Sequence, residues 1–375
     1  MEIIELIFWS CFSLLALVYL GYYSLCLFIV KTRSLKIKKK NSYRPKVSLV
    51  IPTWNEENTI EGKLKNTFKL KYPKNKLEVI VIDSGSTDNT RKIVKKFKRI
   101  KLITEKKRHG KANALNKVFK FCKGDVVVIT DADSRLKENI LLKSMPYFFD
   151  PKVGALTGKL VLINPDENVA TKVEKNYRNI YHVIRNAESI LDSTPIFHGP
   201  FSAFRKDTIE NLSKDSVADD TELAIRVRKK NYKTILIDNA IFWEYTPTKF
   251  SERTKLKQRR AHGVVQVMFR FFSTFFFNPS YKLFGLLIFP VEFFMHVISP
   301  ILFLIIIISA FFLPLNILVS LLVLLSIGLL IPKTRSIILT FLHSQYVCFK
   351  GIINYAFNNQ SYKWEKIHGT RRYKV

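Results

Sequence analysis

The chain has 375 residues, of which 47% are hydrophobic and 24% are charged, and its 61 Lys and Arg against 30 Asp and Glu give a formal net charge of +31. The apolar content excludes an intrinsically disordered chain, which lacks residues to bury. Only four cysteines are present, which excludes a small disulfide-stabilised scaffold. The length allows two or three domains.

The N-terminal segment predicts a membrane anchor. Residues 6–30 carry no charge, and at about 1.5 Å per helical residue they are long enough to cross a hydrocarbon core roughly 30 Å thick. Glu2 and Glu5 precede this stretch and no Lys or Arg does, which favours an uncleaved anchor over a signal peptide. Eight Lys and Arg follow within residues 31–46, so the positive-inside rule predicts a cytoplasmic middle region.

Apolar segments return near the C-terminus. Residues 293–332 contain no Asp, Glu, Lys or Arg and predict two further spans that meet near Pro314. Residues 336–357 are apolar but interrupted by polar side chains, which leaves both a fourth span and a helix lying in the interface open. A basic tail slightly favours the interface helix, and it consists of Lys363, Lys366, Arg371, Arg372 and Lys374.

The excess of positive charge has three interpretations. The sequence contains no nucleic-acid-binding motif, so we expect no nucleic-acid partner. Attraction to the anionic headgroups of a lipid bilayer is a second source of basic character. A site for a polyphosphate substrate is a third.

Between the apolar ends, the chain alternates strands and helices. The expected strands are residues 47–51, 78–82, 101–104 and 126–130, and the expected helices are residues 58–70, 87–97, 112–121 and 221–230. Continuous apolar strands that alternate with helices indicate an α/β domain with a mostly parallel sheet covered on both faces. In such sheets, ligands bind beyond the carboxyl ends of the strands.

Acidic residues follow three of the predicted strands. Glu56 follows the first strand, Asp83 the second, and Asp131 and Asp133 the fourth. Any one of them fits a solvated loop, but together they predict one acidic crevice. Two carboxylates spaced as Asp-x-Asp suit a hard divalent cation, which would neutralise a diphosphate leaving group.

Two further segments carry charges at the start of predicted helices. Lys111 follows Gly110, where amide donors and an ammonium group suit a phosphate, although the spacing is not that of a Walker loop. Asp219 and Asp220 precede the helix at 221–230. An N-capping role and a general-base role are both open for this pair.

Taken in order, these segments resemble family-2 membrane glycosyltransferases, the group of cellulose, hyaluronan and chitin synthases, whose catalytic domain has the GT-A fold. The resemblance covers roughly residues 45 to 275. It rests on the segments PTWNEE (52–57), VIDSGSTDNT (81–90), HGKANALN (109–116), TDAD (130–133), GKL (158–160), FHGPFSAFRKD (197–207), ADDTELAIRVRKKNY (218–232) and RRAHGVVQV (259–267).

The resemblance implies a role for each of several residues. Asp220 corresponds to the general base of an inverting transfer, and Gly199 and Asp219 lie where the acceptor binds. The resemblance also places Mg²⁺ or Mn²⁺ on Asp131 and Asp133. The residues that it places on the nucleoside-diphosphate sugar are Thr53, Asn55, Glu56, Asp83, Lys111, Asp131 and Arg259.

The last motif departs from polymer-forming relatives, which carry Gln-x-x-Arg-Trp. Arg259 keeps the arginine, but Leu256 and Arg260 replace the glutamine and tryptophan, and Pro200 replaces the serine expected after Gly199. The lost glutamine and tryptophan favour transfer of one sugar to a polyprenyl-phosphate carrier. The predicted spans and the segment beside Gly199 favour extension of a polysaccharide or glycan, and a catalytically inactive membrane scaffold is the third hypothesis.

We therefore expect a multi-pass protein of the cell membrane with a cytoplasmic catalytic domain. Its reaction is expected to be a metal-dependent, inverting hexosyl transfer from a UDP-linked sugar to a glycan or lipid-linked acceptor. His198 and His262 are expected to line or pack the site. The expected regions are an anchor at 1–30, a GT-A domain at 31–250, interfacial amphipathic helices at 251–282 and a transmembrane region with the basic tail at 283–375.

Overall fold

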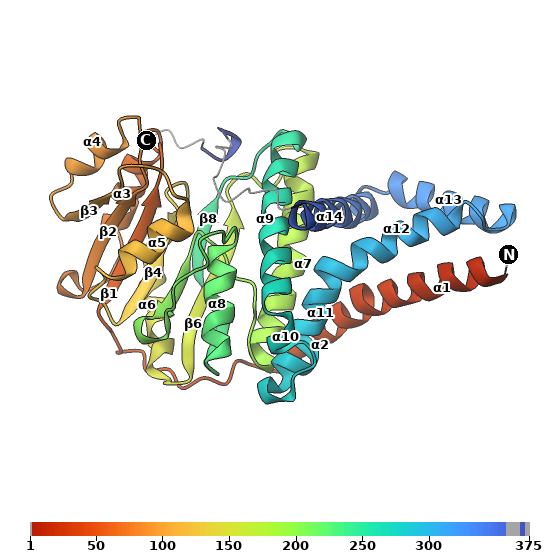
Figure 1. Ribbon diagram of the computed structural model, residues 1–375, viewed down its shortest axis with the longest axis horizontal. Helices are drawn as coiled ribbons and strands as arrows, with labels where there is room; N and C mark the ends of the chain where they lie inside the picture. The colour runs from red at the N-terminus through yellow and green to blue at the C-terminus, as the bar shows by residue number, and fades with distance from the viewer. Residues whose placement is uncertain (1, 358–367, 372–375) are drawn as a thin grey trace.

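The computed structural model describes residues 2–357 and 368–371 of the chain. A sheet domain lies at one end and long apolar helices extend from the other, with helices α7, α9 and α14 between them (Figure 1). These three intermediate helices span Val169–Leu191, Phe250–Arg270 and Pro332–Ala356. Of the predicted basic tail, only Arg371 falls within the described residues; Lys363, Lys366, Arg372 and Lys374 lie outside them.

One eight-stranded sheet forms the centre of the domain, in the order β3-β2-β1-β4-β7-β6-β8-β5. Strands β1 to β4 run parallel, whereas β7 is antiparallel to both β4 and β6, and β5 is antiparallel to β8. The strands are β1 Val47–Thr53, β2 Leu77–Asp83, β3 Ile100–Thr104, β4 Val126–Ile129, β5 Arg135–Leu136, β6 Val153–Leu162, β7 Ser202–Arg205 and β8 Lys233–Glu244. The predicted mostly parallel α/β sheet is therefore confirmed.

Helices cover both faces of this sheet. Successive strand residues point to opposite faces, and those on each face are apolar. In β1, Leu49 and Ile51 face one core, which includes Leu64 of α3. Val50 faces the other core, which includes Leu115 of α5. The helices around the sheet are α3 Ile60–Phe68, α4 Thr90–Lys95, α5 Lys111–Phe119, α6 Ile140–Ser144 and α8 Asp219–Lys229.

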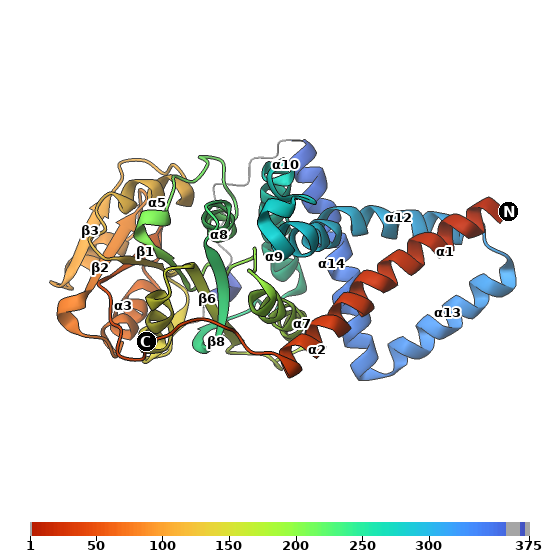
Figure 2. The same ribbon diagram turned by 90° about the horizontal axis from the view of Figure 1, so that it is seen from below.

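The apolar helices project away from the sheet domain on the far side of α7 and α9 (Figure 2). A hydrogen-bonded group ties two of them to α14, since Tyr19 and Gln345 of α14 each lie 2.9 Å from the Ser299 hydroxyl and 2.9 Å from each other. The helices of this part are α1 Glu2–Ala16, α2 Tyr23–Thr32, α10 Phe272–Phe275, α11 Phe289–Phe293, α12 Ser299–Ala310 and α13 Leu315–Leu330, with π-helical turns at Leu17–Tyr22, Phe284–Ile288 and Phe294–Ile298.

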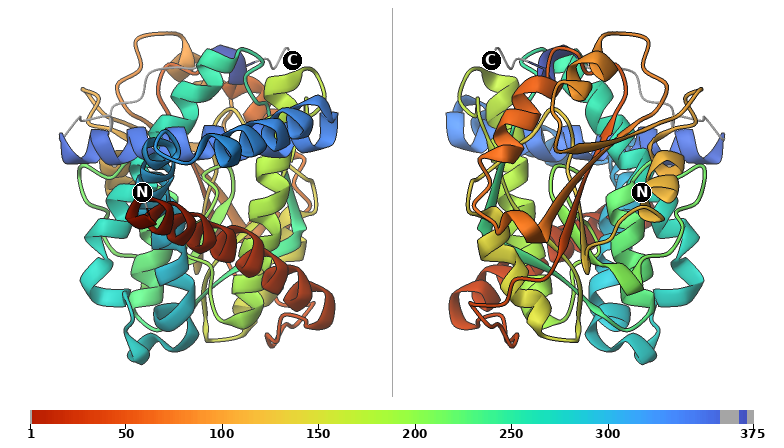
Figure 3. Two further views of the ribbon diagram at one scale, coloured as in Figure 1. Left: turned by 90° about the vertical axis from the view of Figure 1, so that its right-hand side faces the viewer. Right: turned by 90° about the vertical axis from the view of Figure 1, so that its left-hand side faces the viewer.

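By length and composition, three helices in the described part of the chain can cross a membrane, namely Glu2–Thr32, Phe284–Ala310 and Pro332–Ala356. The first two match predicted spans. The second predicted C-terminal span instead forms α13, whose 16 residues are too few for a full crossing. Helix α14 lies crosswise to α1 and α12 (Figures 2 and 3), the orientation expected of a helix in the interface.

Candidate active site

Two pockets meet at the carboxyl end of the central strands. The first encloses about 600 Å³ and the second about 1050 Å³, each partly open to solvent. Lys111 and Asp131 line both pockets. The sheet topology explains this meeting point, because the parallel strands β1 and β4 are neighbours and deliver their following loops to the same edge.

The first pocket collects the predicted residues of the loops after β1 and β4. Thr53 is the last residue of β1, Glu56 comes from the loop that follows it, and Asp131 and Asp133 come from the loop after β4; all four line the pocket. Gly110 lines it as well and precedes α5 with φ +93°, a conformation that side chains rarely adopt. This turn places the first amides of α5 and the Lys111 side chain at the pocket, an arrangement suited to an anion.

Three residues that line the first pocket were not among the predicted site residues, namely Trp54, Arg108 and Arg371. The Arg108 guanidinium stacks 3.5 Å from the centre of the Trp54 ring, which gives the pocket a flat wall. Arg371 donates to Glu56 across 2.6 Å, and the neighbouring Thr370 donates to Asp133 across 3.2 Å. No sequence spacing links Arg371 to Glu56, because 315 positions separate them.

Two predicted donor residues do not line either pocket among the described residues. Asn55 accepts a 2.7 Å hydrogen bond from the amide of Thr87 and so joins the loops after β1 and β2. Asp83 is fully buried and accepts hydrogen bonds from Arg91 and from the amide of Ser86. Both therefore lie where they shape the first pocket, and any contact of theirs with a ligand stays a prediction.

Lys111 links the two pockets electrostatically. Its ammonium lies 2.9 Å from Asp131 Oδ1 and 3.1 Å from Asp219 Oδ2. Burial alone would lower the pKa of Lys111, but the two carboxylates raise it above its usual value. Burial would likewise raise the pKa of Asp131, and Lys111 outweighs this effect and lowers it. Both groups are therefore charged at neutral pH.

Hydrogen bonds to α3 and to the segment around Pro200 hold the loop that carries Asp131. Lys63 of α3 is buried and donates to the hydroxyls of Thr130 and Ser134 across 2.6 and 3.0 Å. Thr130 in turn donates to the carbonyl of Pro200 across 2.7 Å. This last bond explains why the segment around Gly199 runs beside Asp131.

Gly199 separates the predicted metal ligand from the predicted base. A Cβ atom built on Gly199 would lie 2.9 Å from Asp131 Oδ2 and 3.7 Å from Asp220 Oδ2. Both carboxylates line the second pocket together with Gly199 and Asp219. The structure thus brings residues from three distant segments within reach of one small ligand.

Asp219 and Asp220 are the first two residues of α8, and Ala218 occupies the N-cap position without a side-chain hydrogen bond. Asp219 forms an ion pair with Lys111, whereas Asp220 accepts a hydrogen bond from the backbone amide of Thr221. Burial and the neighbouring Asp219 raise the pKa of Asp220 to about 6. A carboxylate with a raised pKa is suited to accept a proton.

Arg259 and Arg260 of α9 also line the second pocket. Burial and the adjacent Arg260 lower the pKa of Arg259 to about 10, so its guanidinium stays charged at neutral pH. Arg260, at the position expected to hold tryptophan, donates to Glu244 across 2.7 Å. The Arg260–Glu244 ion pair therefore lies where the motif of the polymer-forming relatives would place an aromatic tryptophan ring.

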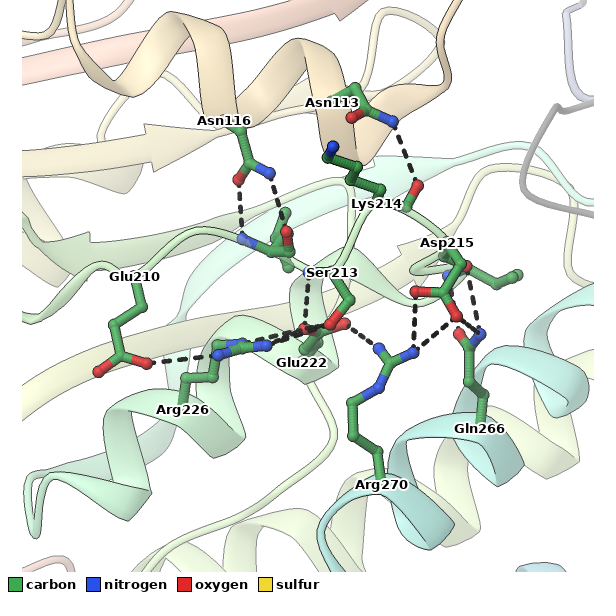
Figure 4. A network of polar contacts seen from close by, with 12 residues as sticks. Asn113, Asn116, Glu210, Ser213, Lys214, Asp215, Glu222, Arg226, Gln266 and Arg270 are labelled. Atoms are coloured by element: carbon green, nitrogen blue, oxygen red, sulfur yellow. Dashed lines mark hydrogen bonds and ion pairs between the residues drawn. The ribbon is translucent and has the colours of Figure 1, made fainter.

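A polar network fixes α8 relative to α5 and α9 (Figure 4). Glu222 of α8 is fully buried and accepts hydrogen bonds from Ser213, Arg226 and Arg270. Arg270 also reaches Asp215 across 2.8 Å. Because α8 begins with the acidic pair, this network sets where Asp220 lies.

The donor set around the first pocket fits a divalent cation bound through few protein ligands. Within the described residues, no group of three or more His, Cys, Asp and Glu is arranged to hold a metal. Asp131 and Asp133 instead offer two carboxylates at the pocket wall. Mg²⁺ characteristically uses one or two carboxylates and completes its shell with water and substrate phosphates.

Comparisons with known proteins point to one family. Residues 48–213 match the family described as glycosyl transferase family 2. The chain is 32% identical over 248 residues to the probable glycosyltransferase YdaM of Bacillus subtilis, covering 62% of this chain and 58% of the relative. It is 26% identical over 247 residues to the poly-beta-1,6-N-acetyl-D-glucosamine synthase of Staphylococcus epidermidis, covering 64% and 60%. The chain thus spans about three fifths of the length of these relatives.

A solved structure matches almost the whole chain. The mannosyltransferase PcManGT from Pyrobaculum calidifontis, in complex with GDP-Man and Mn²⁺, superposes with a TM-score of 0.81 and 26% identity. The match covers 95% of this chain and 99% of that protein. The likeness therefore includes the apolar helices as well as the sheet domain.

Proposed function

Because the chain contains a glycosyltransferase family 2 domain with the GT-A fold, we propose that it transfers a sugar from a nucleoside diphosphate to a hydroxyl group of a glycan acceptor. The observation that carries this proposal is the meeting of two pockets at Lys111 and Asp131. One pocket is suited to a nucleotide and the other to an acceptor, with Asp220 beside their junction.

The first pocket is the proposed donor site. The Trp54–Arg108 wall offers a flat surface for the base, and the start of α5 faces the diphosphate with amides and with Lys111. A divalent cation on Asp131 and Asp133 would supply charge neutralisation to the leaving diphosphate. The similarity to PcManGT, a mannosyltransferase solved in complex with GDP-Man and Mn²⁺, supports a metal and a nucleotide-sugar donor.

Asp220 is the proposed general base. It removes the proton from the acceptor hydroxyl, whose oxygen forms a new bond to the anomeric carbon. The bond between that carbon and the diphosphate oxygen breaks, and its electron pair leaves with the diphosphate. Attack from the side opposite the leaving group inverts the anomeric configuration. Lys111, which lines both pockets, stabilises the negative charge that develops on the leaving group, and the charged Arg259 adds positive charge from the second pocket.

Direct transfer to a polyprenyl phosphate is the second candidate. It is favoured by the loss of the aromatic platform, because the Arg260–Glu244 pair replaces the surface on which a polymer end would stack. In that reaction, a phosphate oxygen replaces the hydroxyl as nucleophile and Asp220 has no proton to remove.

We propose that the protein acts at a membrane with its sheet domain on the cytoplasmic side. Three helices long and apolar enough to cross a bilayer support the membrane location. The cluster of Lys and Arg at residues 31–46 supports the orientation.

A donor screen tests the function. Membranes containing the full chain are incubated with radiolabelled UDP-sugars and GDP-sugars, with Mn²⁺ or with excess chelator. We expect one donor to release nucleoside diphosphate and to label a product only with Mn²⁺, and Asp133→Ala membranes to be inactive. Labelled glycan supports the first candidate, and a lipid product that mild acid cleaves to the monosaccharide supports the second. Absence of turnover with every donor would contradict both.

A further inference from the structure

Lys63 of α3 is a buried cation that the proposed reaction does not use. Its side chain is 2% exposed. Among the described residues, its ammonium nitrogen has three hydrogen-bond partners, which are Thr130 Oγ1 at 2.6 Å, the Ser134 carbonyl at 3.1 Å and Ser134 Oγ at 3.0 Å. None of these three is a carboxylate. A buried ammonium without an ion pair is costly, so its presence under the site calls for an explanation.

The hydrogen bonds around Lys63 favour its charged form. The Thr130 hydroxyl donates its proton to the Pro200 carbonyl across 2.7 Å, and the Ser134 hydroxyl donates to the Asp131 carbonyl across 2.9 Å. Each hydroxyl therefore has only lone pairs left for the lysine, as has the Ser134 carbonyl. Three acceptors need three N–H donors, and among the forms of a lysine only the ammonium supplies three.

The two hydroxyl groups do not need the lysine as a partner. Both of their protons already have a carbonyl acceptor. An apolar side chain of similar length in place of Lys63 would therefore leave no hydroxyl proton unpaired. What Lys63 adds is a positive charge at a fixed position.

This charge acts on the two predicted metal ligands. Burial lowers the pKa of Lys63 to about 7, and the carboxylates of Asp131 and Asp133 oppose this effect. In the other direction, burial raises the pKa of Asp131, but Lys111 and then Lys63 lower it below its usual value. Because like charges repel, the same ammonium opposes the binding of a divalent cation to these carboxylates.

Lys63 also connects two segments of the site. Its partners Thr130 and Ser134 flank the predicted metal ligands, and we call residues 130–134 the metal loop. The bond from Thr130 to Pro200 continues the connection to the segment of Gly199, which lines the second pocket. A chain of hydrogen bonds thus runs from α3 through the metal loop to the acceptor side.

We propose that Lys63 is a positioning residue, whose charge holds the metal loop in its active arrangement against the acceptor segment and thereby weakens cation binding. The proposal rests on the proposed function, because it concerns the metal ligands of that site. It has a consequence that a structural role alone does not have. Loss of the ammonium should tighten the binding of a divalent cation and slow sugar transfer at the same time.

Binding of Mn²⁺ without a donor tests the charge separately from catalysis. The full chain in non-ionic detergent is titrated with Mn²⁺ at pH 6.5, below the pKa of Lys63, and bound Mn²⁺ is measured from the loss of the free-ion EPR signal. Ions that Asp133→Ala still binds are subtracted. We expect Lys63→Met and Lys63→Gln to bind Mn²⁺ at least about threefold more tightly than the wild type. Lys65→Met is the matched control, because Lys65 is exposed on the same helix and pairs with Glu61, and its affinity should be unchanged.

Transfer rates at saturating Mn²⁺ test the positioning role. We expect kcat to fall at least about tenfold in Lys63→Met, since small displacements of reacting groups have effects of this size. Thr130→Val removes the bond to Pro200 but keeps the lysine charge, so it should lower kcat without tightening Mn²⁺ binding.

Three results would decide against the inference or against its premise. Unchanged or weaker Mn²⁺ binding in both Lys63 variants would overturn the charge role. A wild-type kcat in Thr130→Val would overturn the connection to the acceptor segment. If the wild-type chain turns over no donor but the Lys63 variants still bind Mn²⁺ more tightly, the charge role stands and only the proposed function is contradicted.

Discussion

The Lys111 ammonium lies 2.9 Å from Asp131 Oδ1, and this ion pair joins the first residue of α5 to the loop after β4. Both residues of the pair line the proposed donor pocket and also the proposed acceptor pocket. The second carboxylate on Lys111, that of Asp219, brings the start of α8 to the same point. One buried cation therefore organises three segments around the site.

Replacement of Lys111 by methionine should remove this organisation. Asp131 and Asp219 would then face each other as buried carboxylates without their shared cation. We expect kcat/KM for sugar transfer to fall by about a hundredfold or more, as for loss of a charge donor near a leaving group. Lys117→Met is the control, because Lys117 lies on the same helix and is exposed. A Lys111→Met enzyme with near-normal kcat/KM would refute the assignment.

The variant Asp220→Asn tests the base directly. An amide keeps the size of the side chain but cannot accept the proton, so kcat should drop by about two orders of magnitude or more. The dissociation constant of the nucleoside diphosphate with Mn²⁺ should stay close to the wild-type value, because Asp220 lies outside the first pocket. If the variant retains its kcat for a hydroxyl acceptor, Asp220 is not the base.

The pH dependence of transfer follows from the raised pKa of Asp220. The base works only when deprotonated, so below pH about 6 log(kcat/KM) should fall by one per pH unit, and above that pH it should level off. The neighbouring carboxylate is one cause of the shift, and Asp219→Asn should therefore move the midpoint to lower pH. A midpoint that does not move in this variant would contradict the coupling of the two acids.

A methyl group on Gly199 should disturb the site more than the fold. Its Cβ would approach Asp131 Oδ2 to 2.9 Å, which forces one of the two segments to shift. We expect Gly199→Ala to lower kcat/KM by about tenfold to a hundredfold, because small displacements of reacting groups have effects of this size. In Gly62→Ala the added Cβ meets its nearest atom at 3.8 Å, and this control should remain fully active. Equal activity of the two variants would contradict the packing described.

Glu174 should be a determinant of stability. It is buried and pairs with Arg178, Arg253 and Lys257, which join α7 to α9 and hold its pKa well below the usual range despite burial. Removal of one partner from a buried charge cluster costs about 3–5 kcal/mol, so Glu174→Gln should lower the unfolding temperature in detergent markedly. Asp166→Asn, which breaks the exposed pair with Lys175, should leave it almost unchanged. Similar temperatures for both variants would contradict this account.

Local sequence patterns were sufficient for the first half of the sheet. Strands β1 to β4 are short, apolar and followed by polar residues, so both their order of appearance and their acidic ends could be predicted. The later strands could not, because β6 and β8 pair across an interval that holds α7, β7 and α8. Their pairing depends on contacts between distant residues, which no local pattern records.

The site shows the same division. Lys111, Asp131, Asp133 and Asp220 come from recognisable motifs, and the structure brings Lys111, Asp131 and Asp220 to one pocket, with Asp133 in the adjoining one. The partners of several predicted residues were not predictable from spacing: Arg91 on Asp83, Thr370 on Asp133 and Arg185 beside His198. Such partners are set by packing of helices and loops around the sheet.

The most direct test of the central claim is a structure of the full chain, determined with Mn²⁺ and a nucleoside diphosphate in a lipid environment. We predict the cation at the carboxylates of Asp131 and Asp133, with the diphosphate between it and the start of α5 and the base against Trp54. A cation or nucleotide bound away from the first pocket, or Asp220 turned away from the space next to Gly199, would contradict the account.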